Sequence, residues 1–486
     1  MSALRQKNSW KQLEGYARAH FANAQWNLLK DTRSQSKKYC SSTQHIMLDY
    51  SEQCINEHAL HLLLTLAEEC DLQNKIKELM AGHLVNTTEH KPALHTALRT
   101  QGDEEIMVNG RNILPDILRV RQHMCALSTQ IRSGEWLGFS GKPITDVVNI
   151  GIGGSALGSQ FCIHALTDFV TDSLQFHFIA GIDPQEFKSV VKKLKPETTL
   201  FIIASKSFTT KETLANMDKV LLWINQPNHI DRHIIAVTAN IKKTKELGIN
   251  NVVPIWNWVG GRYSSCSAIN LITCIAIGFT RFSEMLSGAN EMDKHFLNQE
   301  LAHNIPVLLA VLGIWNNNFL KIHNLLILTY AHDFQQFVPY LQQLDMESNG
   351  KSTDKEGNLV DYATGPIVWG GLANQAQHSY FQLLYEGTHQ IAADLISINM
   401  LDNVMVNTMC EAHKKVLGNR INKNKDPDVG RVIETSINHI SLSDCTPKTI
   451  GALMTMYEHK IFTQSIIWNI NAFDQPGVEL SKQIIG

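Results

Sequence analysis

The sequence lacks the residue spacings that mark metal sites and disulfide frameworks. Its 486 residues include nine cysteines, none of them in a CxxC pair, and 21 histidines without an HExxH pattern. An odd number of scattered cysteines in a long chain favours reduced thiols and therefore a cytoplasmic protein. We expect no bound metal.

The sequence also lacks the residue patterns of a signal peptide and of a membrane span, and it has no surplus of charge. Residues 1–21 mix charged and apolar side chains, so we expect no cleaved signal peptide. The longest apolar run, 266–279, is interrupted by Asn270 and falls short of the ~20 residues of a bilayer span, which predicts a buried helix. With 43 basic and 46 acidic residues, we expect no nucleic-acid or membrane partner, and any anion site must be local.

The chain exceeds the ~250 to 300 residues at which single cores stop growing, so two domains are expected. Residues 1 to about 140 look mostly helical. Their predicted apolar faces include Leu62, Leu63, Ala67, Ile117, Val120 and Met124.

Strand-like and helix-like segments alternate from Ile144 onward. Strands are predicted in TDVVNIG, LQFHFIAG, TLFIIAS, HIIAVTA and NVVPIWNW, and a second α/β unit is expected from about 290 with strands NLLILTY, GPIVWGG and ISINML. Such alternation predicts parallel sheets with helices on both faces. Ligands of these sheets bind beyond the carboxyl ends of the strands.

The segment 199–224 predicts a strand, a loop and a helix. Residues 199–204 form an apolar, β-branched run, and Thr209 with Glu212 predicts a capping box at the start of the helix. The loop between them places four hydroxyls and one ammonium at a helix N-terminus, which favours an anion. The alternative is that Thr209 only caps the helix and the other hydroxyls belong to an ordinary turn.

A glycine-rich segment, GIGGSALG at 151–158, follows the first predicted strand. As GxGxxA it is similar to a dinucleotide fingerprint, but the acidic residue expected at the end of the next strand is missing, because Asp172 precedes that strand and Asp183 follows it. A second phosphate-facing loop that includes Ser155 is the better interpretation. Tight packing of helix on strand is the remaining alternative.

Two further segments carry ionisable residues that have more than one interpretation. Arg262 enters a glycine-rich turn after NVVPIWNW, where it fits either a bound oxyanion or a structural salt bridge. Glu347 ends a predicted helix that stops at Asn349-Gly350, and Gln343 lies one turn before it, off the apolar stripe. A solvated helix end is the alternative. The stripe consists of Phe334, Phe337, Val338, Leu341 and Leu344.

Six motifs, in their order and spacing, closely resemble the glucose-6-phosphate isomerase (phosphoglucose isomerase) family. They are GIGGSALG, ASKSFTTKET, WVGGRYSSCSAIN, MESNGK, QHSYFQLLYEGT and FDQPGVELSK, and the resemblance extends from about residue 92 to Lys482. It implies an α/β fold of two sugar isomerase (SIS) domains, each a parallel sheet flanked by helices in three αβα layers. The expected division is a helical N-terminal region at 1–120 that packs on the second domain, a first SIS domain with the phosphate loops at 121–285, and a second SIS domain with C-terminal helices at 286–486.

The resemblance implies reversible isomerisation of D-glucose 6-phosphate and D-fructose 6-phosphate through a cis-enediol, in glycolysis and gluconeogenesis. It implies a cytoplasmic homodimer without metal or organic cofactor. The family's catalytic residues correspond to Glu347 as the base, with Arg262, His378 and Lys482. Its substrate-binding residues correspond to Gly154, Ser155, Ser205, Lys206, Ser207, Thr210, Gly261, Gln343 and Gln475.

Chemistry explains these residue types. A glutamate of ordinary pKa, about 4.3, is ionised at neutral pH and suits proton transfer between C2 and C1. Arg262 would stabilise the enediolate oxygens. His378 and Lys482 would exchange the proton that opens the cyclic sugar, and in the family this histidine reaches the partner subunit's site.

The sequence departs from the family pattern at three places. Ser207 replaces a threonine, Asn374-Gln375-Ala376 replaces Thr-Asn-Gly, and Pro476 replaces a tryptophan. No ionisable catalytic group is missing, so we expect an active enzyme. Two other classes remain open: a non-catalytic phosphosugar-binding module, and an NAD-dependent oxidoreductase.

Overall fold

The computed structural model describes residues 2–22, 38–103, 105–400, 402, 404–418 and 435–484. The chain packs into two compact units. The terminal unit contains Met1–Met80, Leu84–Lys91 and Glu291–Gly486, and the central unit contains Ala81–His83 and Pro92–Asn290. Residues 92–120 group with the central unit by packing. The predicted domain boundaries after 120 and 285 stay predictions.

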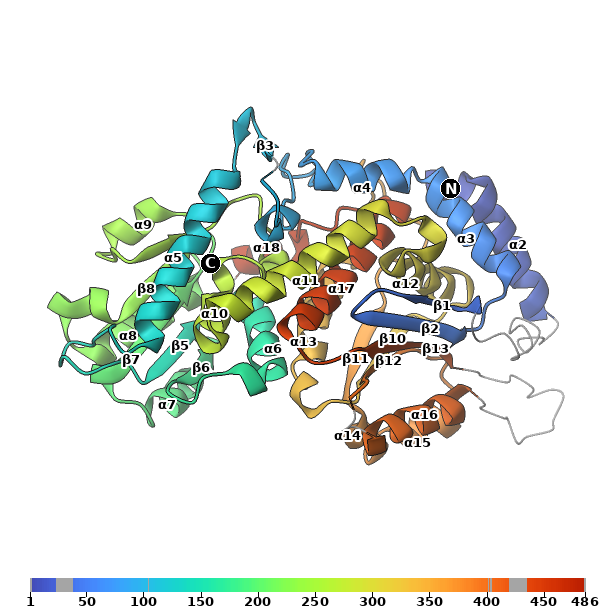
Figure 1. The fold of residues 1–486 in the computed structure, drawn as a ribbon. Coiled ribbons are helices and arrows are strands. Elements are labelled where there is room, and N and C mark those ends of the chain that lie inside the picture. Colours follow the sequence, from blue (N-terminus) through green and yellow to red (C-terminus); the bar gives the residue numbers. More distant parts are fainter. Residues whose placement is uncertain are drawn as a thin grey trace. The chain divides into compact units, whose positions relative to one another are not determined.

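The central unit contains a sheet of five parallel strands in the order β6-β5-β7-β8-β9 (Figure 1). All five coincide with predicted strands. Apolar, β-branched runs such as 199–204 are buried on both faces of the sheet, as expected for parallel strands. The bounds are β5 Asp146–Ile150, β6 Gln175–Ile179, β7 Thr199–Ala204, β8 Ile234–Thr238 and β9 Val252–Pro254.

Helices cover both faces of this sheet. On one face, α7 and α8 bury Phe187, Met217 and Val220 against Phe201 and Ile203 of β7. Helix α10 packs with β5 and α5, and α5 also packs with β9. The bounds are α5 Leu114–Arg132, α6 Leu157–Ala165, α7 Pro184–Val191, α8 Lys211–Ile224, α9 Ile241–Glu246 and α10 Leu271–Ile277, with a two-stranded ribbon of β3 Met107–Val108 and β4 Arg111–Asn112.

The terminal unit contains a six-stranded sheet in the order β1-β2-β13-β12-β10-β11. Strands β10 to β13 are parallel, whereas β2 pairs antiparallel with both β13 and β1. The bounds are β1 Cys40–Ser42, β2 Ile46–Glu52, β10 Asn324–Thr329, β11 Ile367–Leu372, β12 Ala392–Ile398 and β13 Ser436–Leu442.

Helices also flank this second sheet. Residues of α14, α15 and α16 share a core with β10 and β12, while α13 packs on β11 and α17 packs on α12 and β2. The helix α11 contains the boundary between the two units. The bounds are α1 Ala3–Gln6, α2 Asn8–Ala22, α3 Glu57–Glu69, α4 Leu72–Met80, α11 Phe279–Asn298, α12 Ile305–Ile314, α13 Phe337–Leu341, α14 Ala373–Gln377, α15 Phe381–Glu386, α16 Val404–Gly418, α17 Pro447–Ile467 and α18 Pro476–Ile484, with π-helical turns at Trp315–Phe319 and Gln342–Glu347.

The predicted α/β class and the parallel sheets are confirmed, although the predicted strand ISINML overlaps only the end of β12 and β13 was not predicted. The segment 266–279 contains the buried helix α10. The predicted apolar faces of α3 and α5 are buried as expected. The mostly helical interpretation of residues 1–140 is wrong at 40–52, because this segment supplies two strands to the sheet of the terminal unit. No helix among the described residues combines the length and apolar character of a bilayer span.

Candidate active site

Three loops that follow β5, β7 and β9 are joined by hydrogen bonds in the central unit. The Lys206 ammonium donates to the Val259 carbonyl at 3.2 Å, and the Ser264 hydroxyl donates to the Gly154 carbonyl at 3.2 Å. The three predicted anion-binding segments, 151–158, 205–210 and 259–264, therefore form one cluster. It lies at the carboxyl ends of the strands, where ligands of parallel sheets bind.

The loop between β7 and α8 is anchored by a buried aromatic residue. Phe208 is fully buried in the core beneath the sheet although its backbone is left-handed, with φ of 52°. Bulky residues rarely adopt this conformation, and they keep it only where packing over-determines it. Burial of Phe208 thus fixes the loop while Ser207 and Thr209 on either side stay exposed.

The hydroxyls of this loop face one another at the mouth of α8. Ser205 Oγ lies 3.3 Å from Thr210 Oγ1 and accepts the backbone N–H of Phe208 at 3.2 Å. Ser205 is buried, and Lys206 is half-buried. The helix has no side-chain cap at its N-terminus. Hydroxyls, an ammonium and the free N–H groups of a helix start suit a bound anion.

The predicted capping box of Thr209 and Glu212 is wrong. The N-cap is Thr210, which makes no capping hydrogen bond, and α8 begins at Lys211. The Thr209 hydroxyl instead donates to Ser207 Oγ at 2.8 Å within the loop. Since the side chain of Thr209 bonds inside the loop, the first N–H groups of α8 receive no hydroxyl cap from it.

The glycine of the first loop lies against the third loop. A Cβ atom on Gly154 would overlap the backbone of Gly261 and Arg262, so only glycine permits this approach. Arg262 is buried, and its guanidinium lies 5.7 Å from the centre of the Tyr263 ring. The sequence left tight packing of helix on strand open as the reason for these glycines, whereas Gly154 packs on the loop that follows β9. Ser155 of the same loop is half-buried.

In the terminal unit, Gln343 and Glu347 share the π-helical turn Gln342–Glu347 that continues α13. Single π-turns are rare and occur frequently at functional sites. Both side chains are half-buried, and the helix ends at Gly350 as predicted. The predicted apolar stripe of this helix is buried along its length. The solvated-end interpretation is therefore weakened, because Glu347 lies on a helix embedded in the core.

The segment after Glu347 is tied to the start of α18. The Lys351 ammonium donates to the carbonyls of Glu347 and Ser348, at 3.0 and 2.8 Å, and lies 3.3 Å from Asp474. Gln475 follows Asp474, is half-buried, and its carbonyl accepts the backbone N–H groups of residues 478 and 479.

Pro476 opens the helix α18. Proline is favoured at the first helical position, where no N–H is needed, so this departure from the family pattern is compatible with the helix. Lys482 belongs to α18, but its side chain lies outside the described residues.

His378 follows α14 and is exposed. Gln377 and the replaced residues Asn374 and Gln375 are also exposed, whereas Ala376 is buried. The replacement of glycine by Ala376 therefore adds a methyl group to the core beneath this short helix. The role of His378 stays a prediction.

Sequence reasoning missed a buried carboxyl group beside Glu347. Asp345 is buried, with 2% exposure, between Gln343 and Glu347. The sequence does indicate this burial, because Asp345 lies four residues after Leu341 and therefore on the predicted apolar stripe. A charged residue at a stripe position indicates a buried partner.

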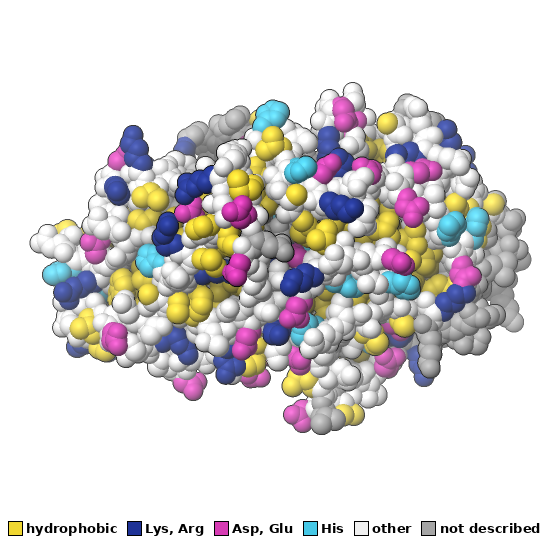
Figure 2. Space-filling model, turned by 45° about the horizontal axis from the view of Figure 1, so that its top comes forward, with side chains coloured by type: hydrophobic (Ala, Val, Ile, Leu, Met, Phe, Trp, Pro, Cys, Tyr) yellow, Lys and Arg dark blue, Asp and Glu magenta, His cyan; other side chains and the backbone are white. Residues whose placement is uncertain are grey.

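Basic and acidic side chains are mixed on one face of the molecule. On the face shown in Figure 2, basic and acidic side chains are interspersed, and neither sign forms a broad field among the residues described there. A basic stripe is the usual footprint of a nucleic-acid surface, and this face does not show one.

Comparison with known proteins gives consistent matches along the chain. The model of the phosphoglucose isomerase family matches residues 49–486. A glucose-6-phosphate isomerase of Legionella pneumophila (strain Paris) is 50% identical over 481 residues, covering 96% of each chain. One of Shewanella sp. (strain ANA-3) is 38% identical over 520 residues, covering 100% of this chain and 94% of the relative. The crystal structure of a glucose-6-phosphate isomerase from Chlamydia trachomatis aligns with a TM-score of 0.88 at 27% identity, covering 100% of this chain and 96% of the other.

Proposed function

This chain belongs to the phosphoglucose isomerase family, and we propose that it catalyses the reversible isomerisation of D-glucose 6-phosphate and D-fructose 6-phosphate. The reaction serves glycolysis and gluconeogenesis. The observation that carries this proposal is the junction of three anion-binding loops in a chain that matches the family from residue 49 to 486. Both units have the sheet-and-helix layers of sugar isomerase (SIS) domains.

The phosphate of the substrate binds in the central unit. Ser205, Lys206, Ser207 and Thr210 supply hydroxyls and an ammonium at the start of α8, and Ser155 supplies a hydroxyl from the first loop. Their remote binding energy orients the sugar, which is how enzymes use groups that do not react. A charge-assisted contact from Lys206 is the strongest of these interactions.

The proton moves between C2 and C1 on the carboxylate of Glu347. It takes the proton from C2 of the open aldose, the C2–H electron pair forms the C1–C2 double bond, and the C1 carbonyl oxygen becomes negative. The C2 hydroxyl proton passes to the C1 oxygen, which leaves the negative charge on the C2 oxygen. The same carboxylic acid then returns its proton to C1, where the electron pair of the C1–C2 double bond forms the new C1–H bond, and the C2 oxygen becomes the ketose carbonyl. Arg262, Gly261, Gln343 and Gln475 bind the sugar oxygens, with the Arg262 cation near the charge that grows in the transition state.

Ring opening requires a second pair of groups. His378 and Lys482 exchange the proton between the ring oxygen and the C1 hydroxyl. His378 comes from the partner subunit of a homodimer, and its exposure on this chain supports that assignment. The reaction moves only protons within one substrate, so the proposal includes no cofactor. The proposal also includes a cytoplasmic location. The nine free thiols of the described chain support it, because thiols stay reduced in the cytoplasm.

The two other classes make different predictions. An NAD-dependent oxidoreductase would need an acidic residue after β6, where the chain has Ala180 and Gly181, whose N–H groups both donate to Glu186 at 2.8 Å. A phosphosugar-binding module would bind the substrate without turnover.

Formation of glucose 6-phosphate from fructose 6-phosphate, measured by a coupled assay without added metal, tests the proposal. Binding without turnover would support the module instead, and a rise in nicotinamide fluorescence on mixing would support the oxidoreductase.

A further inference from the structure

The π-helical turn that carries Glu347 is attached to α17 by a buried ion pair. Lys460 Nζ lies 2.6 Å from Asp345 Oδ2, and each side chain is 3% exposed. Asp345 lies within the turn, two residues before Glu347. Buried ion pairs add little net stability compared with apolar residues of the same volume, and their best attested use is to fix a register.

A second polar contact attaches the other side of Glu347 to the same helix. Asn349 Nδ2 lies 3.3 Å from the carbonyl of Ile461 and 3.3 Å from the Oε1 atom of Gln464. Residues 447 and 449–467 of α17 are buried. Glu347 is therefore flanked, at positions two before and two after it, by side chains held on one buried helix.

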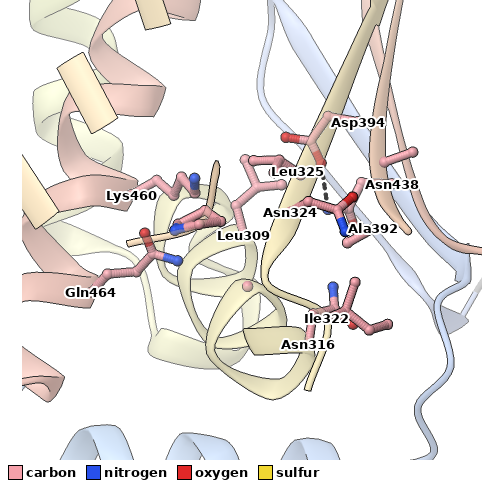
Figure 3. Close-up of a pocket in the computed structure, with 13 residues that line it drawn as sticks. Leu309, Asn316, Ile322, Asn324, Leu325, Ala392, Asp394, Asn438, Lys460 and Gln464 are labelled. Carbon is pink, nitrogen blue, oxygen red and sulfur yellow. Dashed lines mark hydrogen bonds between the residues drawn. The ribbon is translucent and has the colours of Figure 1, made fainter. Parts of the chain in front are cut away.

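Lys460 also lines a cavity of about 20 Å³, together with Asp394 of β12 and Asn438 of β13, which lie across from it (Figure 3). Asp394 accepts hydrogen bonds from Asn438 Nδ2 at 2.8 Å and Tyr457 OH at 2.9 Å. Burial raises the pKa of Asp394, although the Lys460 ammonium acts in the opposite direction. The ammonium thus bonds to the buried carboxylate of Asp345 and acts electrostatically on that of Asp394.

Register matters at this turn because a π-turn contains one residue more than an α-turn. If the extra residue moved along the helix past Glu347, each side chain between its old and new positions would rotate by roughly 100° about the axis. Such a rotation would turn the Glu347 carboxylate away from its place. The ion pair opposes this shift of the turn, because the shift would separate the buried Asp345 carboxylate from the Lys460 ammonium.

We propose that Lys460 and Asp345 are positioning residues for the isomerase reaction, holding the π-helical turn so that the Glu347 carboxylate meets the C1 and C2 hydrogens. The proposal rests on the proposed role of Glu347 as the base. Neither residue touches the substrate. Their effect is on the geometry of proton transfer and not on the phosphate loops.

The test replaces the pair by uncharged side chains of similar size. The double variant Asp345→Asn with Lys460→Met removes both charges together, which is often neutral for stability, so it is expected to fold even if Lys460→Met alone does not. We expect kcat to fall roughly 10- to 100-fold, the effect of a small displacement of a reacting group. The KM and the affinity for 6-phosphogluconate should stay at the parental values. The single variant Lys460→Arg keeps a cation beside Asp345, so it should have a higher kcat than the double variant.

The matched control is Asp293→Asn. Asp293 of α11 lies 2.7 Å from His459, the neighbour of Lys460 on α17, and their side chains are 7% and 0% exposed. This control should keep the parental kcat. An equal loss of kcat in the control, or a parental kcat in the folded double variant, would overturn the proposal.

Exchange of the C2 hydrogen in deuterated water separates this proposal from the proposed function. The double variant should anomerise glucose 6-phosphate normally and exchange C2 slowly. Glu347→Gln, measured beside it, should exchange almost none. If Glu347→Gln keeps parental exchange, the proposed function of Glu347 fails and this proposal fails with it. If Glu347→Gln loses exchange but the double variant does not, only the positioning role is wrong.

Discussion

Lys351 and Asp474 form an ion pair, 3.3 Å between Nζ and Oδ1, that joins the end of the Glu347 helix to the segment preceding α18. Their side chains are 9% and 15% exposed. The same ammonium caps the helix through the carbonyls of Glu347 and Ser348. Asp474 also accepts the hydroxyl of Thr88 at 2.7 Å. Two segments that carry proposed catalytic residues are thus held by one lysine.

Lys351→Met should destabilise the protein because it leaves the Asp474 carboxylate without its ammonium. Removing one partner of a buried pair costs about 3 to 5 kcal/mol, and partial exposure places this pair at or below the low end. The urea concentration at the midpoint of unfolding should fall, and it should fall less for Lys351→Arg, which keeps the positive charge. A double-mutant cycle with Asp474→Asn measures the coupling. A coupling of zero would mean that the two residues are neighbours without a functional ion pair.

Lys206→Ala and Thr210→Val test the phosphate loop. Each should remove a contact worth on the order of 1.5 to 3 kcal/mol, which weakens binding of 6-phosphogluconate by roughly 10- to 150-fold. Isothermal titration calorimetry gives the affinity directly. Unphosphorylated fructose should be a very poor substrate of the parent.

The control for charge is Lys188→Ala. Lys188 is exposed in the second half of α7, so its removal changes the net charge as much as Lys206→Ala does. Its affinity for 6-phosphogluconate should stay parental. Parental affinity in Lys206→Ala or Thr210→Val would show that this loop does not bind the phosphate.

The central strands β7 and β8 could be predicted because each is a continuous run that is buried along its whole length, and β6 and β9, which are partly exposed, were found by their alternation with helical segments. The strands β2 and β13 of the terminal unit were not predicted. In β2 the residues Ile46, Leu48 and Tyr50 alternate with more exposed ones, a strand signal in a segment that was interpreted as helical. Strand β13 contains buried Asn438 and His439, and such polar residues hide an interior strand.

The candidate site was predictable where its signal is local. Helical spacing predicts that Gln343 and Glu347 lie one turn apart, although their roles come only from the resemblance to the family, and hydroxyls at a helix start predict an anion-binding loop before α8. The support around them was not predictable, because Lys460 lies 115 residues from Asp345 in the chain. The π-turn was also missed, since a side-chain stripe at helical spacing does not reveal one additional residue. The prediction that Thr209 caps α8 was wrong because its hydroxyl donates to Ser207 Oγ within the loop.

Mixed dimers test the proposed exchange of His378 between subunits. His378→Ala and Glu347→Gln homodimers should each be nearly inactive. After their subunits are mixed and exchanged, activity should return, because each mixed dimer contains one site in which both residues are intact. The coupled isomerase assay follows the recovery, and mixing either variant with itself is the control. Mixed dimers that stay inactive would show that His378 serves its own subunit or has no catalytic role.

Glu347→Gln separates isomerisation from ring opening and tests the centre of the mechanism. Glutamine keeps the size and hydrogen bonding of the side chain but cannot accept the C2 proton, so kcat should fall by at least about 10²-fold to 10⁴-fold, the usual contribution of a general base. Ring opening depends on other residues and should survive. In deuterated water the parent should exchange the C2 hydrogen of glucose 6-phosphate during turnover, whereas the variant should interconvert the anomers with almost no exchange. Parental C2 exchange in a preparation free of contaminating isomerase would show that Glu347 is not the base, and the half-buried end of this helix would then need another explanation.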